Sequence, residues 1–300
     1  MMKLKGYIFA ALSAAAYGTN PIFAKPLYAD GMNPDSVLLF RYVFAVAVLI
    51  GMMLYNGMKQ GKSISETFSV SRHNLPQLFL LGFMMALSSL TLFVSYNYIP
   101  VGIASTLLFV YPILTALIMT LCFHERLSWL VVISLGIACG GIALLCPMEE
   151  GGISLSGNFF IGLLIVMLSG LSYAIYLVGL NKTRVRTIAS MPVTLYVLLF
   201  GTLLFVVRLA LFSPLTVPQT PVLWLNLLAL GVFPTVISLV LTAKAIQNIG
   251  STQTALLGAL EPVTAVILGY FILGEGVSLR DMGGMVLILS AVTLVVCRRK

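Results

Sequence analysis

Apolar runs of about twenty residues recur along the whole chain, separated by short polar or turn-rich breaks. A membrane-spanning helix needs about 20 consecutive apolar residues. No polar stretch between the runs is long enough for a separate soluble domain. We therefore predict ten membrane spans, at residues 5–24, 36–55, 75–98, 102–123, 127–146, 158–178, 192–212, 222–246, 252–273 and 280–297.

The composition indicates that the bilayer, not water, is the solvent of this chain. Hydrophobic residues make up 60% of the sequence and charged residues only 9%, whereas soluble domains carry about 25% charged residues. A soluble enzyme is excluded because it would lack the polar surface, and a disordered chain because disorder requires low hydrophobicity. We expect an all-α membrane protein with the lipid bilayer as its surroundings.

The basic residues are distributed unevenly between the loops. With the N-terminus inside, the inner loops and ends hold thirteen of the 17 basic residues: Lys3, Lys5, Lys59, Lys62, Arg72, Arg126, Lys182, Arg184, Arg186, Lys244, Arg298, Arg299 and Lys300. The outer loops hold only Lys25 and Arg280. An excess of Lys and Arg marks the cytoplasmic side. We therefore expect both termini in the cytoplasm, and we read the net charge of +8 as a topology signal, not as a nucleic-acid-binding surface.

Two parts of the sequence repeat each other. Residues 96–130 align without a gap on residues 246–280, and the alignment matches a mid-span proline and a span-end glutamate: Pro112 with Pro262, and Glu125 with Glu275. The first and sixth spans also share a Leu-Ser-x-x-x-Tyr pattern, at residues 12–17 and 168–173. We therefore predict two units, residues 1–150 and 151–300, with five spans each.

An odd number of spans in each unit means that the second unit crosses the membrane in the opposite direction. Inverted repeats of this kind are typical of secondary transporters, whose binding site lies near the midplane where the repeats meet. The expected fold is therefore ten transmembrane helices in two inverted five-helix repeats.

The repeated motifs resemble the EamA branch of the drug/metabolite transporter superfamily. The resemblance is carried by residues 111–116 and 124–128 in the first half, by residues 260–265 and 273–278 in the second, and by residues 16–21 and 40–42. It implies a ten-helix inverted-repeat fold with a central cavity, and the transport of small metabolites, often as export. The chain departs from the family pattern at Tyr17, where the family often has Trp, and this puts the shape of the cavity in doubt.

Glu261 lies about nine residues into the ninth predicted span, near mid-depth. A charged residue there costs about 3 kcal/mol on insertion scales. A carboxyl group that takes up and releases a proton is what proton coupling requires. The alternative is structural, with a protonated Glu261 bonded to carbonyls that Pro262 leaves without a donor. The counterpart of Glu261 in the first repeat is Tyr111, so any proton site is expected in one half only.

Three cations lie near the ends of predicted spans, and two of them, Arg41 and Lys244, have two interpretations each. Arg41 provides a counter-charge for an anionic group, or its long side chain extends to the outer interface. Arg208 is expected to extend to the outer interface. Lys244 anchors the inner end of the eighth span, or it forms a gate at the cytoplasmic mouth.

Polar and aromatic residues within the spans form a candidate substrate site. Tyrosine offers a flat apolar face and a hydroxyl group, which suit aromatic or amphipathic solutes. Tyrosines also form interface belts and helix contacts, and the alternative role of Asn20 is to bond the backbone that Pro21 loosens. The candidate substrate-binding residues are Tyr17, Asn20, Arg41, Tyr96, Tyr111, Tyr173, Tyr176 and Lys244. The prolines within spans, which predict kinked or broken helices, are Pro21, Pro112, Pro234 and Pro262.

Together these features predict a secondary transporter of the cytoplasmic membrane that exports small metabolites by alternating access. Amino acids and aromatic or drug-like compounds are the expected solutes, with proton coupling through Glu261. The alternatives are an importer of the same fold and a binding-only or channel-like membrane protein. We expect no enzymatic activity, because His124-Glu125 lacks the second histidine of a zinc motif. No cofactor, metal or nucleic acid is expected, and the sequence leaves the oligomeric state open.

Overall fold

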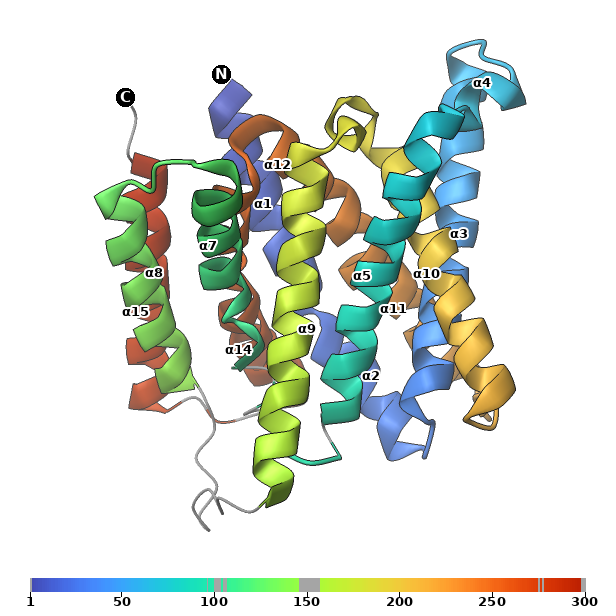
Figure 1. Ribbon diagram of the computed structural model, residues 1–300. Coiled ribbons are helices and arrows are strands. Elements are labelled where there is room, and N and C mark those ends of the chain that lie inside the picture. Colours follow the sequence, from blue (N-terminus) through green and yellow to red (C-terminus); the bar gives the residue numbers. More distant parts are fainter. Residues whose placement is uncertain are drawn as a thin grey trace.

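A computed structural model describes residues 2–95, 97–99, 104, 107–145, 157–274, 276 and 278–297. Within these residues the chain forms helices and their connections only. The helices pack side by side as one bundle, and the first helix begins at its upper end in Figure 1. The predicted boundary between residues 150 and 151 lies outside the described residues, as do Tyr96 and Glu275.

The described helices follow the predicted spans closely. Those of the first half are α1 (Met2–Gly18), α2 (Asn20–Ala29), α3 (Pro34–Lys59), α4 (Ile64–Phe68), η1 (Arg72–Asn74), α5 (Leu75–Ser95), α7 (Tyr111–Phe123) and α8 (Trp129–Leu145). Those of the second half are α9 (Gly157–Lys182), η2 (Arg184–Thr187), α10 (Ser190–Leu211), α11 (Pro221–Gly231), η3 (Val232–Ile237), α12 (Ser238–Ile249), α13 (Ser251–Leu257), α14 (Leu260–Leu273) and α15 (Leu279–Cys297).

Several of these helices match the dimensions of a bilayer. Among the described residues, six helical segments are long and apolar enough to cross a membrane, and α7 and most of α8 are shorter apolar helices. Large apolar side chains also lie exposed on the outside of the bundle, such as Trp129 on α8 and Leu203 on α10. In water these side chains would lower stability, whereas lipid tails accept them. The prediction of an all-α membrane protein is confirmed.

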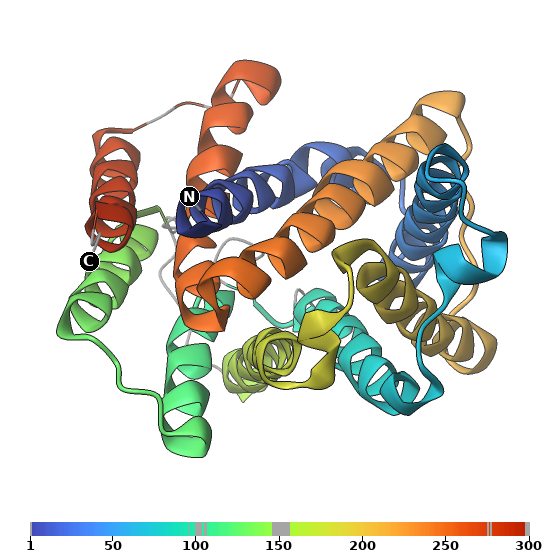
Figure 2. The same cartoon turned by 90° about the horizontal axis from the view of Figure 1, so that it is seen from above.

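The packing relates the two halves to each other. Helix α9 of the second half packs against α5 and α7 of the first half. Conversely, α1 of the first half packs against α12 and α14 of the second half. Two further pairs, α3 with α10 and α8 with α15, join equivalent helices. Figure 2 shows α8 and α15 together at one edge, and α1 beside α12. Since α1 runs down from the upper end in Figure 1 while α9 runs up to it, the halves are inverted repeats.

Each of the four prolines predicted to disturb a span lies at a helix start or an irregular turn. Pro21 and Pro112 occupy the first turns of α2 and α7, where a missing N–H group costs nothing. Pro262 lies in the first turn of α14, after a break at residues 258–259. Pro234 lies within the π-helical segment η3. The first and ninth spans are therefore each built from two helices, as expected of spans that prolines kink or break.

Arg208 differs from its prediction. Its Nε and Nη2 atoms donate to the two carboxylate oxygens of Asp35, both at 3.1 Å, and Ser213 donates to the same carboxylate at 2.6 Å. Asp35 is buried, so removing Arg208 would leave an unpaired buried carboxylate, which is destabilising. Arg208 therefore joins the end of α10 to the start of α3 at the lower end of the bundle.

Candidate functional site

The breaks in the first and ninth spans meet in the middle of the bundle. Gly18, the last residue of α1, packs so closely on α14 that a Cβ atom there would lie 2.7 Å from the Glu261 carbonyl oxygen. Glu261 itself is in the first turn of α14. Only a glycine allows the two backbones to approach this closely. The interrupted helices thus hold Glu261 at the interface between the repeats, as broken helices do around transporter sites.

Two tyrosines from different helices complete this layer. The ring of Tyr111, at the start of α7, meets the ring of Tyr173 on α9 edge-on, with their centroids 4.8 Å apart and their planes at 80°. The Tyr111 hydroxyl occupies the space over Gly258, where a Cβ atom would collide with it. Gly258 lies in the α13–α14 break. The break therefore provides the space in which the Tyr111 side chain lies.

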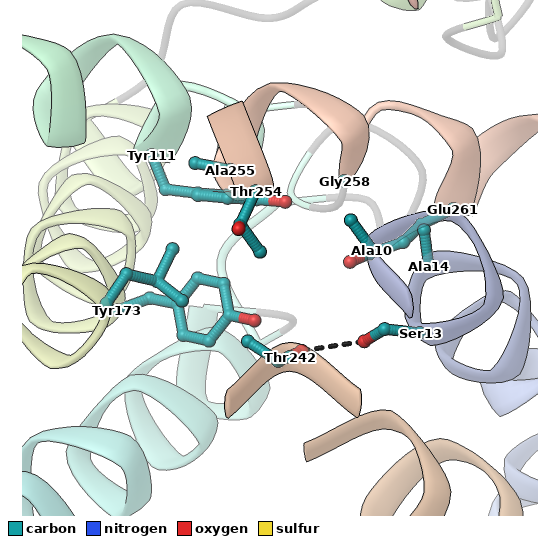
Figure 3. A pocket seen from close by; sticks show the side chains of 11 residues that line it. Ala10, Ser13, Ala14, Tyr111, Tyr173, Thr242, Thr254, Ala255, Gly258 and Glu261 are labelled. Atoms are coloured by element: carbon teal, nitrogen blue, oxygen red, sulfur yellow. Dashed lines mark hydrogen bonds between the residues drawn. The ribbon is translucent and has the colours of Figure 1, made fainter. Parts of the chain in front are cut away.

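Tyr111, Tyr173 and Glu261 border two cavities. The first, about 10 Å³ in volume, has room for about one water molecule. It is lined on its other sides by residues of α1, α12 and α13, including Ser13, Thr242 and Thr254. Figure 3 shows these side chains around it, with the dashed hydrogen bond between Ser13 and Thr242. With the two tyrosines, the cavity has five hydroxyl-bearing side chains and one carboxyl group, so its walls are polar as well as apolar.

The second cavity, of about 20 Å³, lies on the other side of the same layer. Besides Tyr111, Tyr173 and Glu261 it is lined by Tyr17, Leu108 and residues of α5 from Met85 to Leu92. Tyr17 comes after Ser13 on a helix that runs downward in Figure 1, so this cavity is nearer the lower end than the first. The layer of two tyrosines and one glutamate separates the two spaces.

The described walls of the two cavities carry an acidic side chain but no basic one. Among the described residues that line the two cavities, Glu261 is the only acid, and none is Lys, Arg or His. A buried anionic ligand would need a cationic or strongly donating wall. The cavities are therefore suited to neutral groups and to positively charged groups.

The serines of the repeated Leu-Ser-x-x-x-Tyr pattern join the two halves. Ser13 donates to the Ser238 carbonyl oxygen at 2.8 Å, and its Oγ lies 2.6 Å from the Thr242 hydroxyl. Ser169 makes the equivalent bond to the Ser88 carbonyl at 2.7 Å. Ser88 and Ser238 are themselves related by the 150-residue shift of the repeat. Only the tyrosines of this pattern were predicted as site residues. The paired serines, which bond the opposite half, were a signal in the sequence that the prediction did not use.

Arg41 does not extend to the outer interface, because it is only 2% exposed. Its Nε atom donates to Thr235 at 2.6 Å, and its other nitrogens donate to the Pro234 carbonyl at 3.2 Å and to Asn20 Oδ1 at 3.3 Å. The guanidinium carbon lies 5.6 Å from the ring centre of Tyr17. Arg41 lines neither cavity. It holds η3 and the start of α2 together behind the wall that Tyr17 forms.

The remaining candidate residues lie apart from the two cavities. Asn20 accepts the Arg41 bond and lines neither cavity. Tyr176 is buried behind Tyr173, with the two rings stacked 5.9 Å apart, and also lines neither. Lys244 lines a separate cleft at the upper end. The structure thus brings together Tyr17, Tyr111, Tyr173 and Glu261 of the predicted set.

Metal-ligating side chains do not gather in the described part of the chain. In those residues, no three His, Cys, Asp or Glu side chains come close enough together to hold a metal ion. The described site therefore offers carboxyl, hydroxyl and aromatic groups for binding.

Comparisons with known proteins point to one family. The model of the EamA-like transporter family matches residues 4–146 and again residues 160–297. An uncharacterized transporter of Synechocystis sp. is 27% identical over 267 residues, which are 86% of this chain and 78% of that protein. The uncharacterized transporter YdfC of Bacillus subtilis is 24% identical, over 86% of this chain and 80% of YdfC. A crystal structure with 18% identity shares the fold, with a TM-score of 0.80 over 97% of this chain and 96% of that one.

Proposed function

Because the chain belongs to the EamA-like transporter family, we propose that it is a secondary transporter that exports a small solute across the cytoplasmic membrane by alternating access. The observation that carries this proposal is the layer of Tyr111, Tyr173 and Glu261, with a cavity on each side of it. The layer lies where the inverted halves meet. A small movement of one half against the other would shift a bound solute from one cavity to the other without covalent chemistry.

An exposed ion pair joins the two halves at the upper end of the bundle. Lys182, the last residue of α9, pairs with Glu125, which follows α7, at 2.7 Å. Because the pair is exposed, it costs little to break. Opening the first cavity toward the upper end would separate this pair, which is compatible with rapid alternation.

The orientation follows from the basic residues. All ten basic residues of the predicted inner loops up to Lys244 lie at the start of α1, at the ends of α3 and α9, on α12 or in the connections at the upper end of Figure 1. By the positive-inside rule we assign this end to the cytoplasm. The first cavity then lies on the cytoplasmic side of the tyrosine layer and the second on the outer side. Export would move the solute from the first to the second.

The solute class follows from the cavity walls. Three tyrosine rings provide flat apolar faces, and the hydroxyl groups and Glu261 provide polar contacts. We propose amino acids and aromatic or drug-like compounds that are neutral or carry a positive charge. Strongly anionic solutes fit poorly, because the described walls of both cavities have no basic residue.

A tyrosine substitution tests the site. Tyr173→Ala removes a ring that borders both cavities, so we expect the KM for transport to rise about tenfold, since burying an aromatic side chain against a ligand is worth about 1.5–3 kcal/mol. The measurement is the uptake of labelled amino acids and aromatic amines into proteoliposomes. The matched control is Tyr98→Ala, at an exposed tyrosine near the end of α5.

The same vesicles separate the transporter from the alternatives. Saturable flux that Tyr173→Ala weakens and Tyr98→Ala leaves unchanged supports the proposal. Flux that rises linearly with concentration would indicate a channel instead, and binding without flux would indicate a binding-only protein. Equal KM values in the two variants would exclude Tyr173 from the site.

A further inference from the structure

A second hollow lies at the upper end, away from the tyrosine layer. This upper cleft, of about 440 Å³, lies between the end of α3, α4, the start of α10 and α12. Thr242 and Lys244 show that it is separate from the central cavities. They are two residues apart on α12 and so face nearly opposite sides, and Thr242 lines the first cavity while Lys244 lines the cleft.

The polar lining of the cleft is mostly donor groups and positive charge. Lys244 is half-buried and its Nζ lies 5.6 Å from the ring centre of Phe9, but no ion pair joins it to an acid among the described residues. Lys62 lines the rim. Among the described residues of the lining, Glu66 is the one acid; its carboxylate accepts the Ser63 backbone N–H at 2.9 Å and interacts electrostatically with Lys62, so Lys244 is the cleft cation that no carboxylate balances. A partly desolvated ammonium group without a carboxylate favours an anionic ligand.

Further groups suit such a ligand. The amides of Asn56 and Gln60 lie in the lining, and α10 begins in the cleft at Ser190, with no side chain bonded to its first amide groups. These donors and the positive N-terminal end of α10 favour a negatively charged ligand, as the lysines do. The deeper wall is apolar, with Met53 and Met191. The cleft therefore combines an anion-binding rim with an apolar floor.

The surroundings of the cleft place it at the level of lipid headgroups. Tyr55, Met58 and Ile64, on α3 and α4 near the cleft, are each at least 69% exposed to the outside of the bundle. Exposed aromatic and apolar side chains at the end of a membrane helix are typical of the bilayer interface. Basic pockets between helices on the cytoplasmic side are where anionic headgroups bind.

We propose that the upper cleft binds a phosphate-bearing anion through Lys244 and Lys62. The phosphate group can belong to the headgroup of an anionic lipid or to a free phosphate compound, and both present the same chemistry to the lysines. The site is independent of the proposed solute path, because none of the residues that border both central cavities lines it. Binding there would stabilise the contact between α3, α10 and α12.

Thermal unfolding of the full chain in a neutral detergent tests this proposal. The probes are short-chain phosphatidylglycerol, short-chain phosphatidylcholine, glycerol phosphate and inorganic phosphate, each titrated against the wild-type chain, Lys244→Gln, Lys62→Gln and the control Lys59→Gln. Lys59 is an exposed lysine at the same end of α3 that does not line the cleft. Each shift is measured relative to the unliganded form of the same variant, so that a change in basal stability does not enter.

We expect phosphatidylglycerol to raise the unfolding temperature of the wild-type chain and of Lys59→Gln. Loss of either cleft lysine should weaken its apparent affinity about fivefold, since each lysine near a charged headgroup is worth about 1 kcal/mol. A shift with phosphatidylglycerol alone identifies a lipid headgroup, and a shift that the soluble phosphates also produce identifies a free anion. No shift with any phosphate probe beyond that with phosphatidylcholine, or equal affinity in Lys244→Gln and Lys59→Gln, would overturn the proposal.

Discussion

Vesicles that contain Glu261→Gln should lose all solute flux driven by a pH gradient, while exchange of labelled for unlabelled solute across the same membrane continues in part. Glutamine keeps the size of the side chain and its place beside Tyr111 and Tyr173, but an amide cannot bind and release a proton. Glu261 is the only acid that lines the two cavities among the described residues. No other group there can take over the proton.

The measurement uses the solute with the largest saturable flux in proteoliposomes, with and without an imposed pH gradient. Asp30→Asn is the matched control, because Asp30 is an exposed acid at the end of α2. We expect gradient-driven flux in the control to equal that of the wild-type chain, and flux in Glu261→Gln to equal that of vesicles without protein. A pH gradient that still accelerates transport in Glu261→Gln would show that Glu261 is a structural residue, bonded to the carbonyls near Pro262.

The second large effect concerns Gly258. A methyl group at this position would collide with the Tyr111 hydroxyl and would also lie 3.0 Å from the ring carbon that carries it. Gly258→Ala should therefore displace the Tyr111 ring from the layer between the cavities and reduce transport at least about tenfold, since a misplaced binding group loses most of its contribution. Transport into proteoliposomes at equal protein content measures the loss.

A compensating substitution separates this effect from misfolding. Tyr111→Phe removes the hydroxyl oxygen, which is the atom in the closest conflict, so the double variant Gly258→Ala with Tyr111→Phe should recover part of the transport lost in Gly258→Ala. Tyr111→Phe alone gives the reference rate for the missing hydroxyl. If the double variant is as inactive as Gly258→Ala although both enter the membrane, the contact between Gly258 and Tyr111 does not position the layer.

The sequence predicted the parts of the fold that depend on hydropathy. Apolar runs gave the helices to within a few residues, and the repeat of Pro112 and Pro262 predicted two related halves. Pro21 predicted a kink or break in the first span, but nothing predicted the close contact that α1 makes at Gly18, because a glycine within an apolar run is common in membrane helices. Whether such a glycine permits a close approach depends on which helix lies opposite, here α14, and this is a property of tertiary packing.

The candidate site was also predicted only in part, because tertiary packing decides which side chains meet. Residue type and depth were enough to select Glu261 and the tyrosines Tyr17, Tyr111 and Tyr173. Arg41 could not be assigned, since its role depends on the Thr235 hydroxyl and the Pro234 carbonyl oxygen in another helical segment. Lys244 was grouped with the central site because a sequence gives its depth but not the face of α12 on which it lies.

We propose that this chain exports a small solute through the site formed by the tyrosines and Glu261. The most direct test is to overproduce the chain in a bacterium and to compare metabolites in the medium with those from cells that produce the double variant Tyr17→Ala with Glu261→Ala, at equal membrane content. We predict a compound that accumulates outside the cells only with the intact chain. Equal accumulation with both chains would contradict the site, and no accumulation with an intact, membrane-inserted chain would contradict export.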